Sequence, residues 1–157
     1  MGINRHIRLI RKKGPVTAKK VSYDGINFAS GLEKYMYIAL KKAKIKFEYE
    51  GETYTILESF YFDSDSFERQ GNGKGEYINR GNKKILGIKY TPDFISKDFI
   101  IETKGRANES FSMRWKLFKS YMINIGDRRN LYKPQTNKEC DKTIELILKN
   151  GSKTNNK

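Results

Sequence analysis

The sequence has one cysteine, Cys140, and one histidine, His6, among its 157 residues. A single cysteine cannot form an internal disulfide, and the scarcity of both residue types excludes the usual kind of zinc site. Nucleophilic mechanisms of the Ser-His-Asp and Cys-His types are disfavoured as well, since each needs a histidine beside a correctly placed partner. A metal bound by this chain must therefore be held mainly by carboxylates.

Long apolar runs are also missing from the sequence. No stretch approaches the roughly 18 apolar residues that span a bilayer, and the N-terminus carries charges where a secretory signal would be apolar. The length suits a single domain, and 37% hydrophobic with 13% aromatic residues supply a packed core. We therefore expect a globular, soluble, intracellular protein with no membrane partner.

Acidic residues are few compared with basic ones. The chain has 18 Asp and Glu against 32 Lys and Arg, which gives a formal net charge of +14. Soluble domains more often carry a net charge of roughly 2–8, so solubility alone is the weaker explanation. The surplus indicates a polyanionic partner, and nucleic acid is the commonest polyanion in a cell.

The N-terminal segment is basic throughout, because its first 23 residues contain seven Lys or Arg and no acid precedes Asp24. Residues 1–24 are therefore predicted to be a basic arm, with a terminus of no particular role as the alternative. A folded domain is expected over residues 25–150 and a polar tail over residues 151–157. Within the domain, residues 63–84 are rich in Gly, Asn, Asp and Ser and predict a long inserted loop. Its glycine cluster at 71–75 matches neither the spacing of the P-loop nor that of the dinucleotide-binding glycine motif.

Hydrophobic spacing predicts two longer helices and a hairpin. A helix is expected from Ser30, with Ser30 as N-cap, Glu33 completing a capping box, and an apolar stripe at Leu32, Met36, Ala39 and Ala43. A half-buried strand is expected at residues 45–50 and a hairpin at residues 90–104. A second helix has an aromatic stripe for core packing at Phe111, Trp115, Phe118 and Met122, and a short helix is expected at residues 141–148.

The hairpin brings three ionisable residues together, because Asp93 precedes its turn and Glu102-Thr103-Lys104 follows it. Glu102 and Lys104 are two residues apart in a strand and share a face, and Asp93 lies opposite or diagonal to Glu102 if the turn is short. Two such carboxylates repel unless a cation joins them. Mg²⁺ takes oxygen ligands from one or two carboxylates and polarises phosphates, so this set suits phosphodiester hydrolysis.

The acid-x-Lys triplet alone is not specific, because a chain this rich in charged residues contains such triplets by chance, and a surface ion pair is the alternative. Its context makes it informative. The only Pro-Asp pair of the chain lies upstream, an apolar strand leads into the triplet, and Gly105 follows it.

Four ordered motifs carry a family resemblance: Phe28-Ala29-Ser30-Gly31-Leu32-Glu33, Ile45-Lys46-Phe47-Glu48-Tyr49-Glu50, Tyr90-Thr91-Pro92-Asp93-Phe94 and Ile101-Glu102-Thr103-Lys104-Gly105. Together they resemble the bacteriophage endonuclease I family of Holliday-junction resolvases, within the PD-(D/E)xK nuclease superfamily. The resemblance covers about residues 26–105. It implies an α/β fold with a restriction-endonuclease-like core, a central mixed β-sheet flanked by helices. It also implies a phage-encoded protein in the cytoplasm of the host cell.

The resemblance further implies the roles of the site residues. Asp93, Glu102, the carbonyl group of Thr103 and Glu33 would bind Mg²⁺, for which Mn²⁺ substitutes, and Lys104 would be the catalytic lysine. The implied assembly is a segment-swapped homodimer in which Glu33 of one chain joins Asp93, Glu102 and Lys104 of the other. The sequence departs from the family in a longer stretch between Glu50 and Tyr90 and in a C-terminal strand that is hard to find.

These observations predict a Mg²⁺-dependent endonuclease that resolves four-way junctions in branched double-stranded DNA and needs no small-molecule cofactor. Basic residues expected to contact DNA are Arg8, Arg11, Lys12, Lys13, Lys34, Lys41, Arg106 and Arg114. One alternative is a nuclease of the same superfamily that acts on mismatched, transposon-end or specific linear DNA. The other is a basic nucleic-acid-binding protein without catalytic activity, whose carboxylates pair with lysines.

Overall fold

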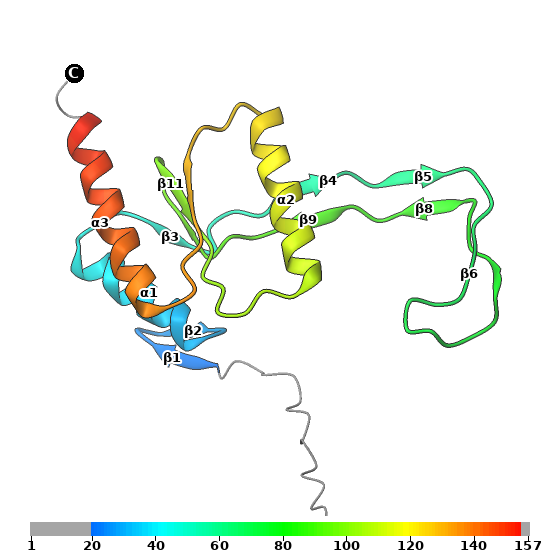
Figure 1. Ribbon diagram of the computed structural model, residues 1–157, viewed down its shortest axis with the longest axis horizontal. Coiled ribbons are helices and arrows are strands. Elements are labelled where there is room, and N and C mark those ends of the chain that lie inside the picture. Colours follow the sequence, from blue (N-terminus) through cyan, green and yellow to red (C-terminus); the bar gives the residue numbers. More distant parts are fainter. Residues whose placement is uncertain (1–19, 155–157) are drawn as a thin grey trace, which may run out of the picture.

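The structure, a computed structural model, describes residues 20–154 (Figure 1). Its elements, in chain order, are β1 (Val21–Tyr23), β2 (Ile26–Phe28), α1 (Gly31–Lys42), β3 (Glu48–Tyr49), β4 (Tyr54–Leu57), β5 (Phe60–Phe62), β6 (Phe67–Glu68), β7 (Ile78–Asn79), β8 (Lys83–Ile85), β9 (Ile88–Tyr90), β10 (Phe94–Ile95), β11 (Phe99–Ile101), α2 (Glu109–Asn124), β12 (Asn130–Tyr132) and α3 (Asn137–Thr154). No helix in this described part is long and apolar enough to cross a membrane.

A four-stranded mixed sheet forms the centre of the α/β fold, in the order β12-β11-β10-β3. Strand β10 pairs antiparallel with β3 and with β11, whereas β11 and β12 run parallel. Strand β12 was not predicted from the sequence pattern. Helices lie on both faces of the sheet (Figure 1), so the expected sheet flanked by helices is present.

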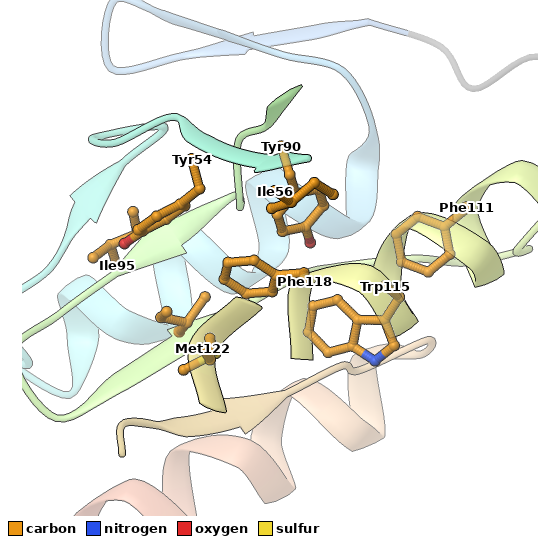
Figure 2. Close-up of a cluster of buried hydrophobic side chains, with 9 residues drawn as sticks. Tyr54, Ile56, Tyr90, Ile95, Phe111, Trp115, Phe118 and Met122 are labelled. Carbon is orange, nitrogen blue, oxygen red and sulfur yellow. The ribbon is translucent and has the colours of Figure 1, made fainter. Parts of the chain in front are cut away.

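Side chains on the two faces of the β10–β11 hairpin pack into two separate cores, because successive residues of a strand point to opposite faces. Ile95 and Ile100 point to one face and pack with Tyr54, Tyr90 and the aromatic residues of α2. Figure 2 shows Phe118 of α2 between Tyr90 and Met122, with Trp115 beside them. Phe94, Phe99 and Ile101 point to the other face and pack against α1 and α3, with buried Cys140 among them.

Helix α1 begins as the sequence predicts, but it buries a different stripe. The Ser30 side chain accepts a hydrogen bond from the Glu33 amide, so the N-cap is confirmed. The buried residues are Glu33, Met36, Tyr37 and Leu40, and of the predicted stripe only Met36 is fully buried. Apolar residues surround this helix, so several stripes fit the sequence, and packing against β1, β2 and α3 selects among them. The aromatic stripe of α2 is confirmed at all four positions.

Several segments differ from their predicted form. The first 19 residues of the predicted basic arm lie outside the described part of the chain, and β1 already begins at Val21. Only Glu48 and Tyr49 form a strand within the predicted strand at 45–50. The last helix is longer than residues 141–148 and extends to Thr154, into the predicted polar tail.

The predicted loop at 63–84 is part of a long two-stranded antiparallel ribbon. Three successive strand pairs build it, β4 with β9, β5 with β8, and β6 with β7. Figure 1 shows it extending from the body beyond α2 and bending at its far end. The strand pairs are only two to three residues long beyond β4, which is too short for a recognisable alternation in the sequence.

Candidate active site

The two carboxylates of the predicted constellation flank the β10–β11 hairpin. Phe94 pairs with Ile101 and Ile95 with Ile100, so the same register places Asp93 directly opposite Glu102. The short turn is closed by a hydrogen bond from the Ser96 amide to the Phe99 carbonyl group, 2.9 Å long. The predicted juxtaposition of Asp93 and Glu102 is thereby confirmed.

Residues 102–104 continue the strand direction of β11, although β11 itself ends at Ile101. The Glu102 amide donates to the Tyr132 carbonyl group at 3.0 Å, and the Lys104 amide donates to the Pro134 carbonyl group at 3.1 Å. This extension of the parallel ladder keeps the backbone extended, so Glu102 and Lys104 project to the same face. Lys104 reaches α2, where its Nζ lies 4.8 Å from the ring centroid of Phe111.

Thr103 positions Asp93. Its amide and its hydroxyl group both donate to Asp93 Oδ2, each over 2.6 Å. In extended backbone a residue's amide and carbonyl group point to the same edge. The Thr103 carbonyl group is therefore directed to the Asp93 side of the strand, as a ligand role would require.

Tyrosines hold the other two carboxylates. The Tyr90 hydroxyl group, at the end of β9, donates to Glu102 Oε2 at 2.7 Å. The Tyr49 hydroxyl group, at the end of β3, donates to Glu33 Oε2 at 3.0 Å. Glu33 also accepts bonds from the Ala29 amide at 2.9 Å and the Ser30 hydroxyl group at 3.0 Å. Glu33 and Glu102 are both buried, and these hydrogen bonds make their burial tolerable.

The site brings negative charge together in a poorly solvated place. Burial, and after it the charge of Glu102, raises the pKa of Asp93 to about 8. Burial likewise raises the pKa of Glu102, although the Tyr90 hydroxyl group and the charge of Lys104 oppose the change. The charge of Glu33 adds to the increase at both residues. All three carboxylates therefore interact within one chain.

The tyrosines respond to the same charges. Burial, followed by the charge of the bonded carboxylate, raises the pKa of Tyr49 beside Glu33 and of Tyr90 beside Glu102. Both hydroxyl groups consequently stay protonated and act as donors at physiological pH. Sequence reasoning assigned neither tyrosine to the site. The available signal was that each ends a strand next to a motif acid.

The donor set is chemically suited to a hard cation. Across residues 20–154, no group of three or more His, Cys, Asp or Glu side chains is placed to hold a metal ion. Mg²⁺ does not need one, since it binds through one or two carboxylates and keeps several waters. Two facing carboxylates with raised pKa values are what a cation would stabilise in their charged form. Asp93, Glu102 and the Thr103 carbonyl group therefore fit Mg²⁺.

The residues predicted to contact DNA are spread over different parts of the chain. Arg114, on the exposed side of α2, lies close enough to Glu102 to lower its pKa. Lys34 and Lys41 of α1 lie over the rings of Tyr23 and Tyr37, at 5.1 and 5.5 Å from the centroids. Arg106 is exposed between Lys104 and α2. Those in the N-terminal arm, Arg8, Arg11, Lys12 and Lys13, lie outside the described residues.

Lys133 is a basic residue near the site that the sequence analysis did not assign to it. Its Nζ lies 5.9 Å from the ring centroid of Phe111, the ring that Lys104 also covers. Two ammonium groups thus converge on the Glu102 side of the site. The parallel pairing of β12 with β11 brings Lys133 there, and that pairing was not recognisable in the sequence.

Comparison with known proteins identifies the family of the chain. No curated protein and no solved structure matches the chain. A family model described as "Protein of unknown function (DUF1064)" matches residues 13–133, which include Glu33, Asp93 and the Glu102-Thr103-Lys104 triplet and cover most of the chain. The chain therefore belongs to the DUF1064 family.

Proposed function

We propose that this protein is a Mg²⁺-dependent endonuclease of the PD-(D/E)xK type that hydrolyses phosphodiester bonds in branched double-stranded DNA. One observation carries the proposal. Asp93 lies opposite Glu102 on neighbouring strands, and Lys104 shares the face of Glu102. A surface ion pair would not need two facing acids, of which Glu102 is buried and Asp93 half-buried, with raised pKa values.

Each residue has a distinct role in this proposal. Asp93, Glu102 and the Thr103 carbonyl group hold Mg²⁺, and Glu33 holds a water on the same side. The bound ion supplies Lewis-acid polarisation of the phosphate and a lower pKa for a coordinated water. Lys104 orients the attacking water and offsets the charge that develops on the phosphate oxygens. Tyr90 and Thr103 fix the two acids so that little reorganisation is needed during the reaction.

The basic surface provides the substrate affinity. A net charge of +14 favours phosphate backbones irrespective of sequence, and such binding weakens steeply with salt. Arg114 and Lys133 lie beside the acids and are suited to contact the scissile strand. Preference for four-way junctions over linear duplexes rests on the family resemblance, and a direct comparison of the two substrates tests it.

The decisive experiment measures cleavage of a labelled four-way junction and a matched linear duplex with Mg²⁺, Mn²⁺ or EDTA. We expect Glu102→Gln and Lys104→Ala to lower the cleavage rate by at least about 100-fold while junction affinity changes little. Asp98→Asn and Lys97→Ala are matched controls, because both residues are exposed at the far end of the same hairpin. They should cleave like the wild type.

One result would refute the proposal. If the wild type leaves junction and duplex intact with either metal, the protein is not this nuclease. If that inactive wild type still binds DNA, and the binding ignores Mg²⁺ and Asp93→Asn, a non-catalytic nucleic-acid-binding protein is favoured. Equal cleavage of linear and branched DNA would support the nuclease activity but contradict the preference for branched DNA.

The proposed enzyme acts as a homodimer, so that two sites cut paired strands. In the single chain, the charge of Glu33 already acts on Asp93 and Glu102, and a swapped segment is not required to assemble a site. Mixing Glu33→Gln with Lys104→Ala chains tests this arrangement. If each site is built within one chain, every site carries one of the two substitutions and stays inactive. If the segments are swapped, each mixed dimer has one site with both an intact Glu33 and an intact Lys104, and it cleaves DNA.

A further inference from the structure

The outer part of the two-stranded ribbon, residues 57–88, exposes an unusual share of apolar surface. It carries eight of the 14 exposed large apolar side chains found among the described residues. These are Leu57, Phe60, Tyr61, Phe62, Phe67, Tyr77, Ile78 and Leu86, with exposures from 38% to 78%. Neither buried cluster includes a side chain from residues 57–87.

The ribbon nevertheless has a defined shape, which its own polar groups maintain. Asp65 Oδ1 accepts bonds from the side-chain amides of Asn79 and Asn82, 2.6 and 2.8 Å long. Asn79 Oδ1 accepts from the amides of Ser66 and Gly81. A Cβ atom at Gly81 would overlap the Ser64 carbonyl oxygen, so the two strands approach too closely there for any other residue. Two aromatic contacts add to these bonds, since the Tyr61 hydroxyl group donates to the Asn82 carbonyl group at 2.7 Å and the Phe67 and Tyr77 ring centroids lie 6.2 Å apart.

An isolated two-stranded ribbon is marginally stable in water and has two open edges that can pair with another strand. Its five exposed Phe and Tyr residues alone have about 400–700 Å² of solvent-exposed side-chain surface. Typical monomers have largest apolar patches of about 300–600 Å², and a stable interface buries about 800 Å² on each partner. With the aliphatic residues included, the two faces of the ribbon together approach the area that a dimer needs.

Charge identifies the kind of partner. Residues 57–88 contain five acids and five basic residues, so the whole surplus of +14 lies elsewhere in the chain. A surface built for DNA carries an excess of Lys and Arg, which this ribbon lacks. Two copies of so basic a protein repel each other. A neutral, apolar extension is the part through which they approach with least repulsion.

We infer that residues 57–88 dock against the same ribbon of a second copy and form the dimer contact. The contact is isologous, with the same apolar residues and open strand edges supplied by both copies. The inference takes from the proposed function only the expectation of a homodimer, and it requires neither catalysis nor an exchanged N-terminal segment.

The test measures mass by analytical ultracentrifugation of the full chain, without DNA or Mg²⁺. Tyr61→Ser with Leu86→Ser removes two side chains on one face of the ribbon, 64% and 78% exposed. A second double variant, Phe60→Ser with Phe62→Ser, changes the opposite face. Met113→Ser with Ile123→Ser is the matched control on α2, where the side chains are 66% and 67% exposed.

We expect a dimeric wild type and dimeric control, and at least about 100-fold weaker dimerisation in one or both ribbon variants. All variants should keep a melting temperature close to that of the wild type under conditions that leave them monomeric, because the replaced side chains belong to neither core and Tyr61 loses only an exposed hydrogen bond to the Asn82 carbonyl group.

A monomeric wild type overturns the inference, as does a control that dissociates as much as the ribbon variants. Ribbon variants that stay dimeric but lose junction affinity would assign the ribbon to DNA instead. Failure of the nuclease proposal is separate from these outcomes, because a wild type that dimerises through the ribbon but cleaves no DNA leaves this inference intact.

Discussion

Asp93 should make the folded protein less stable at neutral and alkaline pH in the absence of divalent ions. Its pKa is raised from 3.8 to about 8. Below about pH 4 the carboxyl group is protonated in both folded and unfolded chains and has no effect. As the pH rises from about 4 to 8, only the unfolded chain releases the proton freely, so stability falls until it levels off above pH 8.

The size of the effect follows from the shift. A change of this extent corresponds to about 4 kcal/mol of lost stability at pH 7. Glu102 titrates together with Asp93, so we assign about 2–4 kcal/mol to removing one charge. Asp93→Asn keeps an oxygen that accepts the Thr103 bonds and removes the charge. It should therefore raise the melting temperature by about 5–15 °C at pH 8.5.

The assay is thermal unfolding in EDTA at pH 4 and pH 8.5, with Asp98→Asn as control. The gap between Asp93→Asn and the wild type should be present at pH 8.5 and nearly absent at pH 4. Saturating Mg²⁺ should stabilise the wild type, by about 3 kcal/mol at 100 times its Kd, and leave Asp93→Asn almost unchanged. A variant less stable than the wild type at pH 8.5, or a gap independent of pH, would refute the electrostatic reasoning.

Three further predictions follow from the contacts of the site and core. Ser30→Ala removes the N-cap of α1 and one bond to Glu33, and urea unfolding should show a loss of about 1 kcal/mol, whereas Ser30→Asp should lose less. Tyr90→Phe removes a donor that lowers the pKa of Glu102, so the acid limb of the cleavage pH profile should move to higher pH; an unmoved limb would deny Tyr90 this role. Buried Cys140, whose pKa burial raises to about 12, should react with thiol reagents only after unfolding, and fast labelling of the folded chain would contradict its burial.

The centre of the site could be predicted from the sequence because it depends on local geometry. Asp93 and Glu102 are joined by a short hairpin, and the strand period and the turn together fix which residues face each other. Lys104 then follows from the same period. No long-range information was needed, and the register agreed with the prediction.

The supporting residues depend on contacts that are distant in sequence, and these were not predicted. Tyr90 and Tyr49 look like ordinary strand residues until the fold brings their hydroxyl groups to Glu102 and Glu33. Lys133 joins the site through a parallel pairing with β11, which leaves no signal in a three-residue strand. The prediction of the buried face of α1 was wrong for a related reason, since the neighbouring elements decide which apolar residues of the helix are covered.

The ribbon was predicted as a loop because its composition is typical of one. Its strands are held by pairs that are distant in sequence, such as Phe60 with Ile85, 25 residues apart, and by side-chain bonds of Asp65 and Asn79 at the bend. Apolar residues in such a segment have no core to enter. Propensity alone therefore could not distinguish an exposed ribbon from an irregular insertion.

The ribbon leaves and rejoins the body of the protein next to the candidate site. Tyr49 ends β3 shortly before the ribbon leaves the body, and Tyr90 ends β9 where it returns, and each donates to a site carboxylate. If two copies meet through their ribbons, that contact sets the distance between their sites. Tyr61→Ser with Leu86→Ser should then separate two activities on a plasmid that extrudes a four-way junction. The monomer should still nick one strand and yield nicked circles, but it should lose paired cuts and the linear product. Linear product at the wild-type rate from a monomeric variant would show that paired cutting does not depend on the ribbon contact.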